Sequence, residues 1–442
     1  MGVGVGYVRR QPETGALHEA VRRGWPSVES RVPKRVREEV RRYLECGQLR
    51  YGFLEVACEG CRELSLVAFS CKGRGWCPSC TTRRAVETAL RLEAQLPEVA
   101  HRQWTLSVPR GLRLAVVKRP GLLKVVEKAL VRAVWRWQRG TAKGLGVTGP
   151  LQGAATAFSQ WFGSSLQLTP HLHVLVPEAQ WRAEGEVVEL PPPDDADVEA
   201  VLERLVRQLR AALADVEGAL PDDEYEGLQQ EALQGQLQLP GEARARKRRV
   251  AVRAGFSLHA DTAVHGHDRE GLARLCRYAA RGPVAESRVR RLPDGRYEYT
   301  TKHGLSLVMT AEALVKRLVA LVPPSRQHLT AAHGVYAANA RLRPVVLRQE
   351  PTPKVQEATP AATAEGSGPR AKRRPKLDWA TVQARTFGED VWQCGRCGGR
   401  RRIVAVVTSH RTAEEVLRNL GLLPKRKLLP PEHGPPQLEL AM

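Results

Sequence analysis

The chain has 442 residues and is strongly basic, with 69 Lys and Arg against 47 Asp and Glu, a formal net charge of +22. Hydrophobic residues make up 42% of it, which is enough for real cores and excludes a wholly disordered protein. No apolar run approaches membrane-spanning length, and the start turns polar too soon for a signal peptide. The charge predicts a polyanionic partner, so we expect a cytoplasmic, nucleoid-associated bacterial protein that binds DNA and no membrane.

The N-terminal region is rich in cysteine, and in a reducing compartment such clusters bind metal more often than they form disulfides. Two C-x2-C pairs have the two-knuckle spacing of a structural four-thiolate zinc site. These pairs are Cys58, Cys61, Cys77 and Cys80. Cys71 could replace one of the four ligands, and Cys46, at the end of a helical pattern, is expected to serve in packing. We expect residues 1–95 to form an N-terminal arm and a zinc-binding, DNA-binding domain.

Basic and aromatic side chains are interleaved with these cysteines. They are Lys72, Arg74, Trp76, Arg83 and Arg84. Cations that contact phosphates beside an aromatic ring that stacks on bases are typical of a DNA-binding surface. In the alternative interpretation Trp76 covers the zinc knuckle and the cations form a solvated face, and both interpretations can hold together.

The pattern of residues 96–345 predicts an α+β domain. Its first elements are a strand over 103–108, a helix over 122–137, a strand over 155–162 and a strand that begins at residue 169. Long Leu, Ala, Arg and Glu patterns over about 183–250 indicate a helical insertion with a basic exit. The sheet pattern then resumes at GFSLHADTAV, which places His259 on a strand.

The most informative motif is TPHLHVLVPE, in which His171 and His173 flank one leucine. Alternate residues of a strand face the same side, so both imidazoles would point one way, and Leu172, Val174 and Val176 the other. Two ring nitrogens on rigid backbone can hold one divalent ion with positions open for a phosphate, as in a metal-dependent nuclease. The alternative for an isolated H-x-H is a pair of solvent-facing histidines.

A helix is predicted downstream, from a capping Asp268 to the stop at Gly282 and Pro283. It carries one apolar stripe, formed by Leu272, Leu275, Cys276 and Ala279. Tyr278 lies at the flank of this stripe, toward a basic face formed by Arg274, Arg277 and Arg281. There a phenol could meet a phosphodiester, because arginines stabilise both a phenolate and a pentavalent transition state. The alternative is a packing role for the tyrosine.

Six motifs, in this order, resemble a known family. They are CRELSLVAFSCKGRGWCPSC, QWTLSVPRGLR, SQWFGSSLQLTPHLHVLV, FSLHADTAV, GLARLCRYAARGPVAESRV and LVALVPPSRQHLTAAHGVYAANARLR. The resemblance is to the rolling-circle transposases of the insertion-sequence-ninety-one family, within the His-hydrophobe-His endonuclease class. It covers roughly residues 36–345 and, more loosely, the rest of the chain.

The resemblance implies a palm-like antiparallel sheet with helices and the cleavage and joining of single-stranded DNA at element ends. By that resemblance His171 and His173 bind Mg²⁺ or Mn²⁺, and Tyr278 attacks the scissile phosphate, which leaves a 5′-phosphotyrosyl enzyme and a free 3′-OH. The third metal ligand stays open between Gln160 and His259, with Gln167 as a weaker alternative. Host replication factors are expected as partners, and a homodimer is compatible with the pattern.

Two positions depart from the family pattern. Arg274 stands four residues before Tyr278, where some members carry a second tyrosine, so a one-tyrosine enzyme is expected. Ala332 stands where a tyrosine usually precedes the HG of the last motif, and we assign that segment no catalytic role. Two other functions remain open, a plasmid or phage replication initiator with the same nuclease core and an inactive zinc-dependent DNA-binding protein. No nucleotide-binding motif occurs, so no nucleotide hydrolysis is expected.

The end of the chain divides into a linker and a small unit. Residues 346–376, rich in Pro, Ala and Thr with a basic end, are expected to be a flexible linker. Residues 377–442 are expected to form a small C-terminal domain. It contains Cys394 and Cys397, which are only half a zinc site. His410 or His433 could help to complete it, and the alternative is a knuckle without metal or a degraded zinc ribbon.

Overall fold

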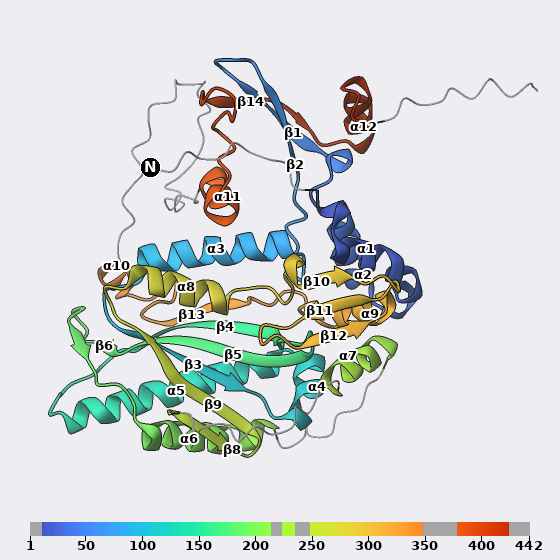
Figure 1. Ribbon diagram of the computed structural model, residues 1–442. Helices are drawn as coiled ribbons and strands as arrows, with labels where there is room; N and C mark the ends of the chain where they lie inside the picture. Colours follow the sequence, from blue (N-terminus) through green and yellow to red (C-terminus); the bar gives the residue numbers. More distant parts are fainter. Residues whose placement is uncertain (1–10, 214–222, 235–247, 348–377, 424–442) are drawn as a thin grey trace, which may run out of the picture.

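The computed structural model describes residues 11–213, 223–234, 248–347 and 378–423 (Figure 1). The chain has the α+β architecture that its sequence predicts, with an antiparallel sheet between two layers of helices. A narrower part that contains β1, β2 and β14 extends from one side of this body (Figure 1).

The centre of the molecule is a six-stranded sheet in which every neighbouring pair of strands is antiparallel. In spatial order its strands are β13 (Thr330–Gly334), β4 (Ala154–Phe162), β5 (Leu168–Pro177), β3 (His101–Ser107), β9 (Phe256–Val264) and β8 (Val250–Arg253). The predicted strands at 103–108, 155–162 and 169 onward correspond to β3, β4 and β5, and β4 is buried along its whole length.

One face of the sheet packs against α5 (Gly121–Gly144) and α6 (Asp195–Leu213), and the other lies beneath α8 (Arg269–Ala279) and α3 (Pro78–Gln95) (Figure 1). Residues 172, 174 and 176 belong to the same apolar core as the buried side of α5 and α6. Phe158 and Leu175 belong instead to a second core with α3 and α8. The helical insertion therefore covers one sheet face, and α8 covers the other.

The remaining elements flank this body. The helices are α1 (Ala16–Gly24), α2 (Lys34–Glu45), α4 (Arg110–Lys118), α7 (Glu224–Gln234), α9 (Ala311–Ala320), α10 (Arg343–Val346), α11 (Trp379–Phe387) and α12 (His410–Asn419). Single 3-10 turns lie at Pro12–Thr14, Trp25–Ser27, Glu29–Arg31, Leu49–Tyr51 and Glu286–Arg288. Two small antiparallel sheets are formed by β10 (Val289–Arg291), β11 (Tyr297–Thr300) and β12 (Ser306–Met309), and by β6 (Ala179–Trp181) and β7 (Val187–Glu189).

The N-terminal region contacts later parts of the chain at several places, the packing of α3 against α8 among them. Helix α1 packs against α9 and β10, so the first helices lie against residues that come late in the sequence. In the narrower part, β1 (Phe53–Cys58) pairs with β2 (Leu64–Ala68) on one edge and with β14 (Arg401–Val407) on the other. The described part of the expected C-terminal domain thus shares a sheet with the cysteine-rich N-terminal region. Nearly all of the expected linker lies outside the described residues.

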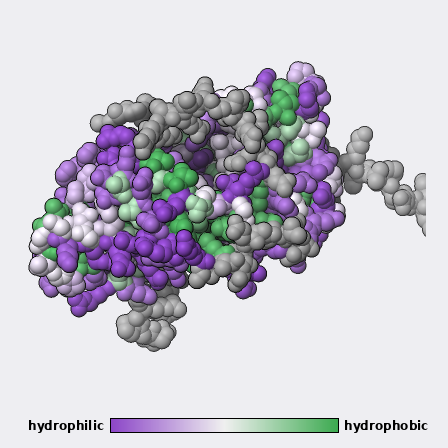
Figure 2. All heavy atoms as spheres, turned by 90° about the horizontal axis from the view of Figure 1, so that it is seen from below, coloured by the Kyte–Doolittle hydropathy of each residue, from purple (hydrophilic) through white to green (hydrophobic). Residues whose placement is uncertain are grey.

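Seen from below, the side of α5 and α6, the surface is mostly hydrophilic, with apolar residues in scattered patches (Figure 2). Among the described residues, no helix has the length and apolarity that a membrane span requires.

Candidate active site and metal centres

His171 and His173 project from β5 toward the face of the sheet beneath α8. Their ring centroids are 5.0 Å apart. Nδ1 of His171 donates a hydrogen bond to the carbonyl oxygen of Thr169 at 2.7 Å, and Nδ1 of His173 lies 3.1 Å from the hydroxyl of Thr105 on β3. Because both Nδ1 atoms are engaged, the Nε2 atoms are the ones available to a metal ion, an arrangement typical of ligating histidines.

The surroundings keep both histidines neutral. Burial lowers the pKa of His171 to about 4, and the hydrogen bond to Thr169 opposes this shift. The positive charges of Arg281, Arg113 and Lys302 lower the pKa further. Burial, together with His171 and nearby cations, also places the pKa of His173 well below its ordinary value. Neutral imidazole is the form that binds metal ions, so near neutral pH the pair is ready to do so.

Gln160 is the neighbour of His171 across the β4–β5 pair. Its side-chain amide nitrogen donates to the carbonyl oxygens of Tyr278 at 3.2 Å and Ala279 at 2.7 Å, which fixes the orientation of the amide. The other amide atom, Oε1, is buried and has no hydrogen-bond partner. A buried acceptor without a partner is costly, and a metal ion would remove that cost.

The other predicted third ligands are placed less favourably. His259 lies on β9 beyond β3, opposite Thr105, and its Nε2 is 2.9 Å from the hydroxyl of Ser257. Among the described residues, no His, Cys, Asp or Glu joins the histidine pair in a group with ligand atoms within 4.8 Å of one another. Gln167 lies in the turn between β4 and β5.

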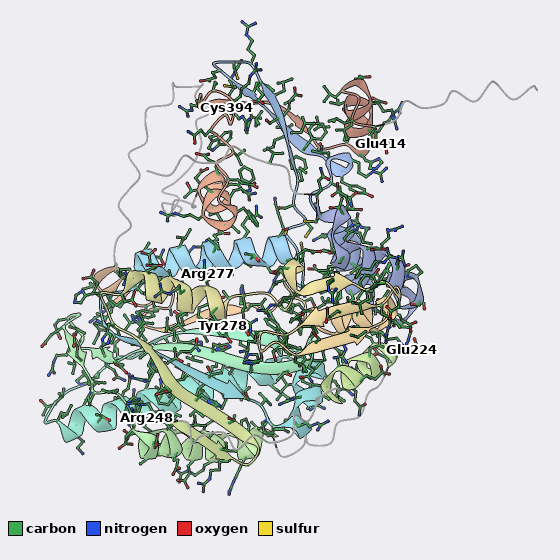
Figure 3. All side chains as sticks on the ribbon, viewed as in Figure 1. Glu224, Arg248, Arg277, Tyr278, Cys394 and Glu414 are labelled. Carbon is green, nitrogen blue, oxygen red and sulfur yellow. The ribbon has the colours of Figure 1, made fainter. Side chains whose placement is uncertain are left out.

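Tyr278 faces this site from α8, the helix capped by Asp268 as predicted, whose side chain accepts from the backbone nitrogen of Gly271 (Figure 3). The tyrosine is 39% exposed, and its ring meets that of His173 edge-on at 5.9 Å. Lys302 Nζ donates to the phenol oxygen at 3.1 Å, and the Arg281 guanidinium lies 4.7 Å from the ring centroid. Burial raises the pKa of Tyr278, but Lys302 and Arg281 outweigh it, so the net pKa lies below the ordinary value.

The cations predicted on this helix have different environments, and Arg281 lies just past the end of α8 at Ala279. Arg281 lies between the rings of Tyr278 and Phe162, at 4.7 and 5.3 Å from their centroids. Arg277 is exposed next to Tyr278, whereas Arg274 is paired with Glu270 at 2.9 Å. Two cations near the site, Lys302 and Arg113, are absent from the sequence-based prediction. Lys302 lies in the turn between β11 and β12, where nothing local marks it, whereas Arg113 falls within the QWTLSVPRGLR motif.

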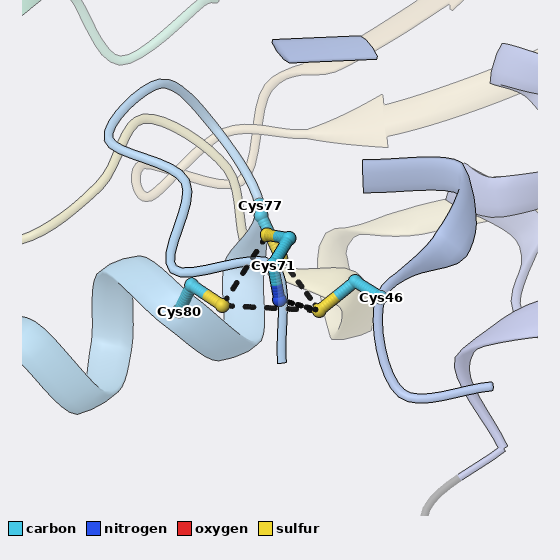
Figure 4. A group of neighbouring side chains, drawn as sticks. All are labelled: Cys46, Cys71, Cys77 and Cys80. Carbon is cyan, nitrogen blue, oxygen red and sulfur yellow. Dashed lines mark hydrogen bonds between the residues drawn. The ribbon is translucent and has the colours of Figure 1, made fainter. Parts of the chain in front are cut away.

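The first metal centre is a cluster of four cysteines near the start of α3 (Figure 4). Its members are Cys46, Cys71, Cys77 and Cys80. The sulfur of Cys80 lies 3.8 Å from that of Cys46 and 3.4 Å from that of Cys71. The sulfurs of Cys77 and Cys46 are 3.7 Å apart. A tetrahedron with Zn–S bonds of about 2.3 Å has edges of roughly 3.8 Å, so the cluster fits zinc.

The predicted ligand set is therefore wrong in its membership. Cys77 and Cys80 lie together, but their partners are Cys46 and Cys71, because the loop after β2 brings Cys71 beside the end of α2 and the start of α3. Cys46 is thus part of the cluster, not a packing residue.

The other half of the predicted set lies in a second cluster, with Cys58 and Cys61 beside Cys394 and Cys397. The pairing of β1 with β14 brings these distant segments together. His410 is not part of this group of four cysteines, and its Nε2 lies instead 3.7 Å from Glu414. His433 lies outside the described residues. None of the nine cysteines forms a disulfide.

The predicted DNA-binding residues around the first cluster are only partly available. Trp76 is 1% exposed and packs on Tyr43 with ring centroids 4.4 Å apart, so the prediction that it stacks on bases is wrong. Arg84 donates to the carbonyl oxygens of Gly73 and Lys72 at 3.1 and 2.9 Å, and Arg74 to that of Gln327. Lys72 and Arg83 line a shared cavity of about 570 Å³ with Trp379 of α11.

Two family models match the chain. Residues 19–108 match the family described as "Transposase zinc-binding domain", and residues 153–343 match the family described as "Putative transposase". Together these matches take in more than half of the chain. The chain belongs to the transposases of the insertion-sequence-ninety-one family. No curated protein and no solved structure matches it.

The two family matches cover different sites of this transposase. The zinc-binding match contains the whole first cysteine cluster, so a structural zinc site there follows from both the family and the geometry. It contains only Cys58 and Cys61 of the second cluster. The other match contains β4, β5 and α8, and with them the histidine pair and Tyr278. As a transposase, the protein acts on DNA.

Proposed function

We propose that this transposase cleaves and rejoins single-stranded DNA at the ends of its element, with Tyr278 as the nucleophile. The observation that carries the proposal is the position of the phenol, hydrogen-bonded by Lys302 at 3.1 Å and facing His173 with the rings 5.9 Å apart. A nucleophile whose pKa is lowered beside a pair of neutral imidazoles is the combination that phosphoryl transfer to a tyrosine requires.

His171, His173 and Gln160 would hold a catalytic Mg²⁺ or Mn²⁺. The buried Oε1 of Gln160 supports this ligand set. Gln160 is paired with His171 on the neighbouring strand, and its Oε1 accepts no hydrogen bond. His259 is separated from His173 by β3, about two strand spacings or roughly 10 Å. When bound, such an ion polarises the scissile phosphate and stabilises charge on its oxygens.

Several residues of this chain have distinct tasks in the proposed step. Lys302 holds the phenolate of Tyr278 by donating to its oxygen, and Arg281, beside the ring, is placed to accept phosphate charge. The phenolate oxygen forms a bond to phosphorus while the bond from phosphorus to the 3′ oxygen breaks. The 3′ oxygen takes up a proton and leaves as a 3′-OH, and the DNA stays on the enzyme as a 5′-phosphotyrosine.

The reverse of this step joins a 3′-OH to the held strand, which supports a rolling-circle type of transposition. The net charge of +22 and exposed Arg277 next to Tyr278 are consistent with a DNA strand that crosses α8. Position 274 carries an arginine paired with Glu270, so we propose one covalent joint per chain. Host replication factors would then supply strand separation and synthesis.

The test is covalent capture of labelled single-stranded oligonucleotides that carry the ends of the element, in Mg²⁺ or Mn²⁺, on a denaturing gel. Wild-type protein should form a metal-dependent adduct, and the Tyr278→Phe variant should form less by a factor on the order of 10⁴ or more, since a removed nucleophile has no substitute. Tyr51→Phe is the matched control, because Tyr51 is similarly exposed at 36% but lies in the 3-10 turn before β1. An adduct in the Tyr278→Phe variant, or none in the wild type, contradicts the proposal.

A further inference from the structure

We propose that Cys58, Cys61, Cys394 and Cys397 bind a second structural zinc ion, which fastens residues 378–423 to the N-terminal strands β1 and β2. The inference is independent of the catalytic mechanism, because the cluster lies in the narrower part of the molecule, well away from Tyr278 (Figure 3). It concerns how the two ends of the chain are held together.

The sulfur positions fit one ion. The four sulfurs lie within 4.8 Å of one another, with Cys58 and Cys397 3.4 Å apart and Cys61 and Cys394 3.6 Å apart. Tetrahedral zinc with Zn–S bonds of about 2.3 Å requires sulfur separations of roughly 3.8 Å, so a shift of a few tenths of an ångström completes the site.

The two C-x2-C turns have the same backbone structure. In the first, the nitrogen of Arg62 bonds to the oxygen of Cys58, and in the second the nitrogen of Gly398 bonds to that of Cys394. Arg62 has a φ of 60° and Gly398 a φ of 72°, so each turn is closed by a residue in the left-handed region at the same place. Two matching turns that face each other are typical of a zinc site built from paired knuckles.

Backbone amides point at the sulfurs. Those of Gly60 and Cys61 hydrogen-bond to Cys58, and those of Arg396 and Cys397 to Cys394. Such bonds stabilise thiolates, which are the form that binds zinc. The space around the sulfurs is also restricted, since a Cβ on Gly399 would lie 3.2 Å from the sulfurs of both Cys58 and Cys397.

The charges around the cluster compensate for a bound ion. Four thiolates and Zn²⁺ carry a net charge of −2, and five arginines adjoin the cysteines in the sequence. They are Arg62, Arg396, Arg400, Arg401 and Arg402. Glu63 connects the two groups, because it accepts from Cys394 Sγ at 3.0 Å and from Arg401 at 3.3 Å. Once Cys394 gives up its proton to bind zinc, the hydrogen bond from Arg401 remains to neutralise Glu63.

Little apolar packing holds this segment in place. Its two apolar clusters contain seven buried residues in total, in addition to the pairing of β14 with β1 and the contact of α11 with α3. They are Phe53, Val407, Ala413 and Leu417 in one, and Val56, Val67 and Val391 in the other. Units with so little buried surface are commonly stabilised by a metal ion.

Metal content of the full-length protein tests the inference. After purification under reducing conditions, wild-type protein should contain two zinc ions per chain and the Cys394→Ser/Cys397→Ser variant one. The Cys397→His variant should keep two, because the exposed position can accept an imidazole ligand. Cys276→Ala is the matched control, since Cys276 is buried outside both clusters, and it should also keep two. One zinc in the wild type, or two in the double serine variant, overturns the inference.

Hydrogen exchange provides the second measurement. In the double serine variant, amides of residues 401–407 and 53–58 should exchange at least about tenfold faster, while those of β5 keep their wild-type rates. Unchanged exchange over 401–407 would overturn the fastening role even if zinc is lost. The mass of the protein is the last check. If it is lower by the hydrogens lost in two disulfides, and these four cysteines are the ones oxidised, the metal site itself is overturned.

Discussion

The two faces of the central sheet are formed by the same strands but have different chemistry. On the side of α5 and α6, Leu172, Val174 and Val176 are at most 1% exposed and belong to one continuous apolar core. On the side of α8, His171 and His173 alternate with them along the same strand and face a half-exposed tyrosine. On the α5 side this strand contributes only to the apolar core, whereas the α8 side combines a second apolar core with a polar site that could hold a ligand.

Two buried polar groups, one on each side, illustrate the difference. On the α5 side, the carboxylate of Glu127 is fully occupied by His333 and Lys124, each at 2.9 Å, so it needs nothing from outside. On the α8 side, Gln160 Oε1 is buried without a partner. Gln180 Oε1 and the indole nitrogens of Trp137 and Trp161 are also buried without partners near α5, so this property alone does not mark a site. Gln160 Oε1 differs because it lies beside two neutral imidazoles, which a metal ion could bind together with it.

The largest effect is expected from two neighbouring substitutions on β5. His173→Ala should reduce DNA cleavage by more than about a hundredfold, because even outer partners of metal ligands cost 10- to 100-fold, and should leave thermal unfolding near wild type. Val174→Ala should do the reverse, with a loss of about 2–3 kcal/mol of stability and nearly normal cleavage by the folded protein. Cleavage assays and calorimetry on both variants check this, and similar profiles for the two would contradict a division of labour between the faces.

A smaller effect should separate the two open third ligands. Gln160→Ala is expected to raise the concentration of Mn²⁺ needed for half-maximal cleavage by about 10- to 100-fold, and Gln160→Glu to restore much of the affinity, because it supplies an oxygen at the same position. His259→Ala should leave that concentration near its wild-type value, since β3 lies between His259 and the pair. The opposite ranking of the two alanine variants would assign the third position to His259.

Local sequence patterns were sufficient for the parts of the site that depend on local geometry. The alternation of a strand determines where the two histidines point, and Asp268 marks the start of α8 by bonding to a nitrogen three residues on. Both depend on spacings of a few residues, which the sequence displays directly.

The cysteine partners and Lys302 could not be predicted in this way. Cys58 and Cys61 have a spacing to Cys77 and Cys80 that suits one zinc site, yet β14 brings Cys394 and Cys397 closer, and only the fold determines that pairing. Trp76 occurs among arginines as a DNA-stacking residue would, but it fills the space against Tyr43. Lys302 reaches Tyr278 because a hairpin turn ends beside α8, which no short motif encodes.

The smallest effect is expected at Lys302, and it concerns pH. Lys302 favours the phenolate, so Lys302→Met should raise the pKa of Tyr278 and move the rising limb of the cleavage rate to higher pH. At pH values below the rising limb, the cleavage rate of the variant should be about tenfold lower than that of the wild type. This is the lower end of the effect of losing a charge-assisted hydrogen bond, because Tyr278 is 39% exposed and solvent screens part of the interaction. Lys302→Arg should retain most of the wild-type profile, since it keeps the charge.

Lys128→Met, on the exposed side of α5, is the control and should leave the profile unchanged. If Lys302→Met lowered the rate equally at every pH, Lys302 would serve in DNA binding and the phenolate would owe its stability to Arg281.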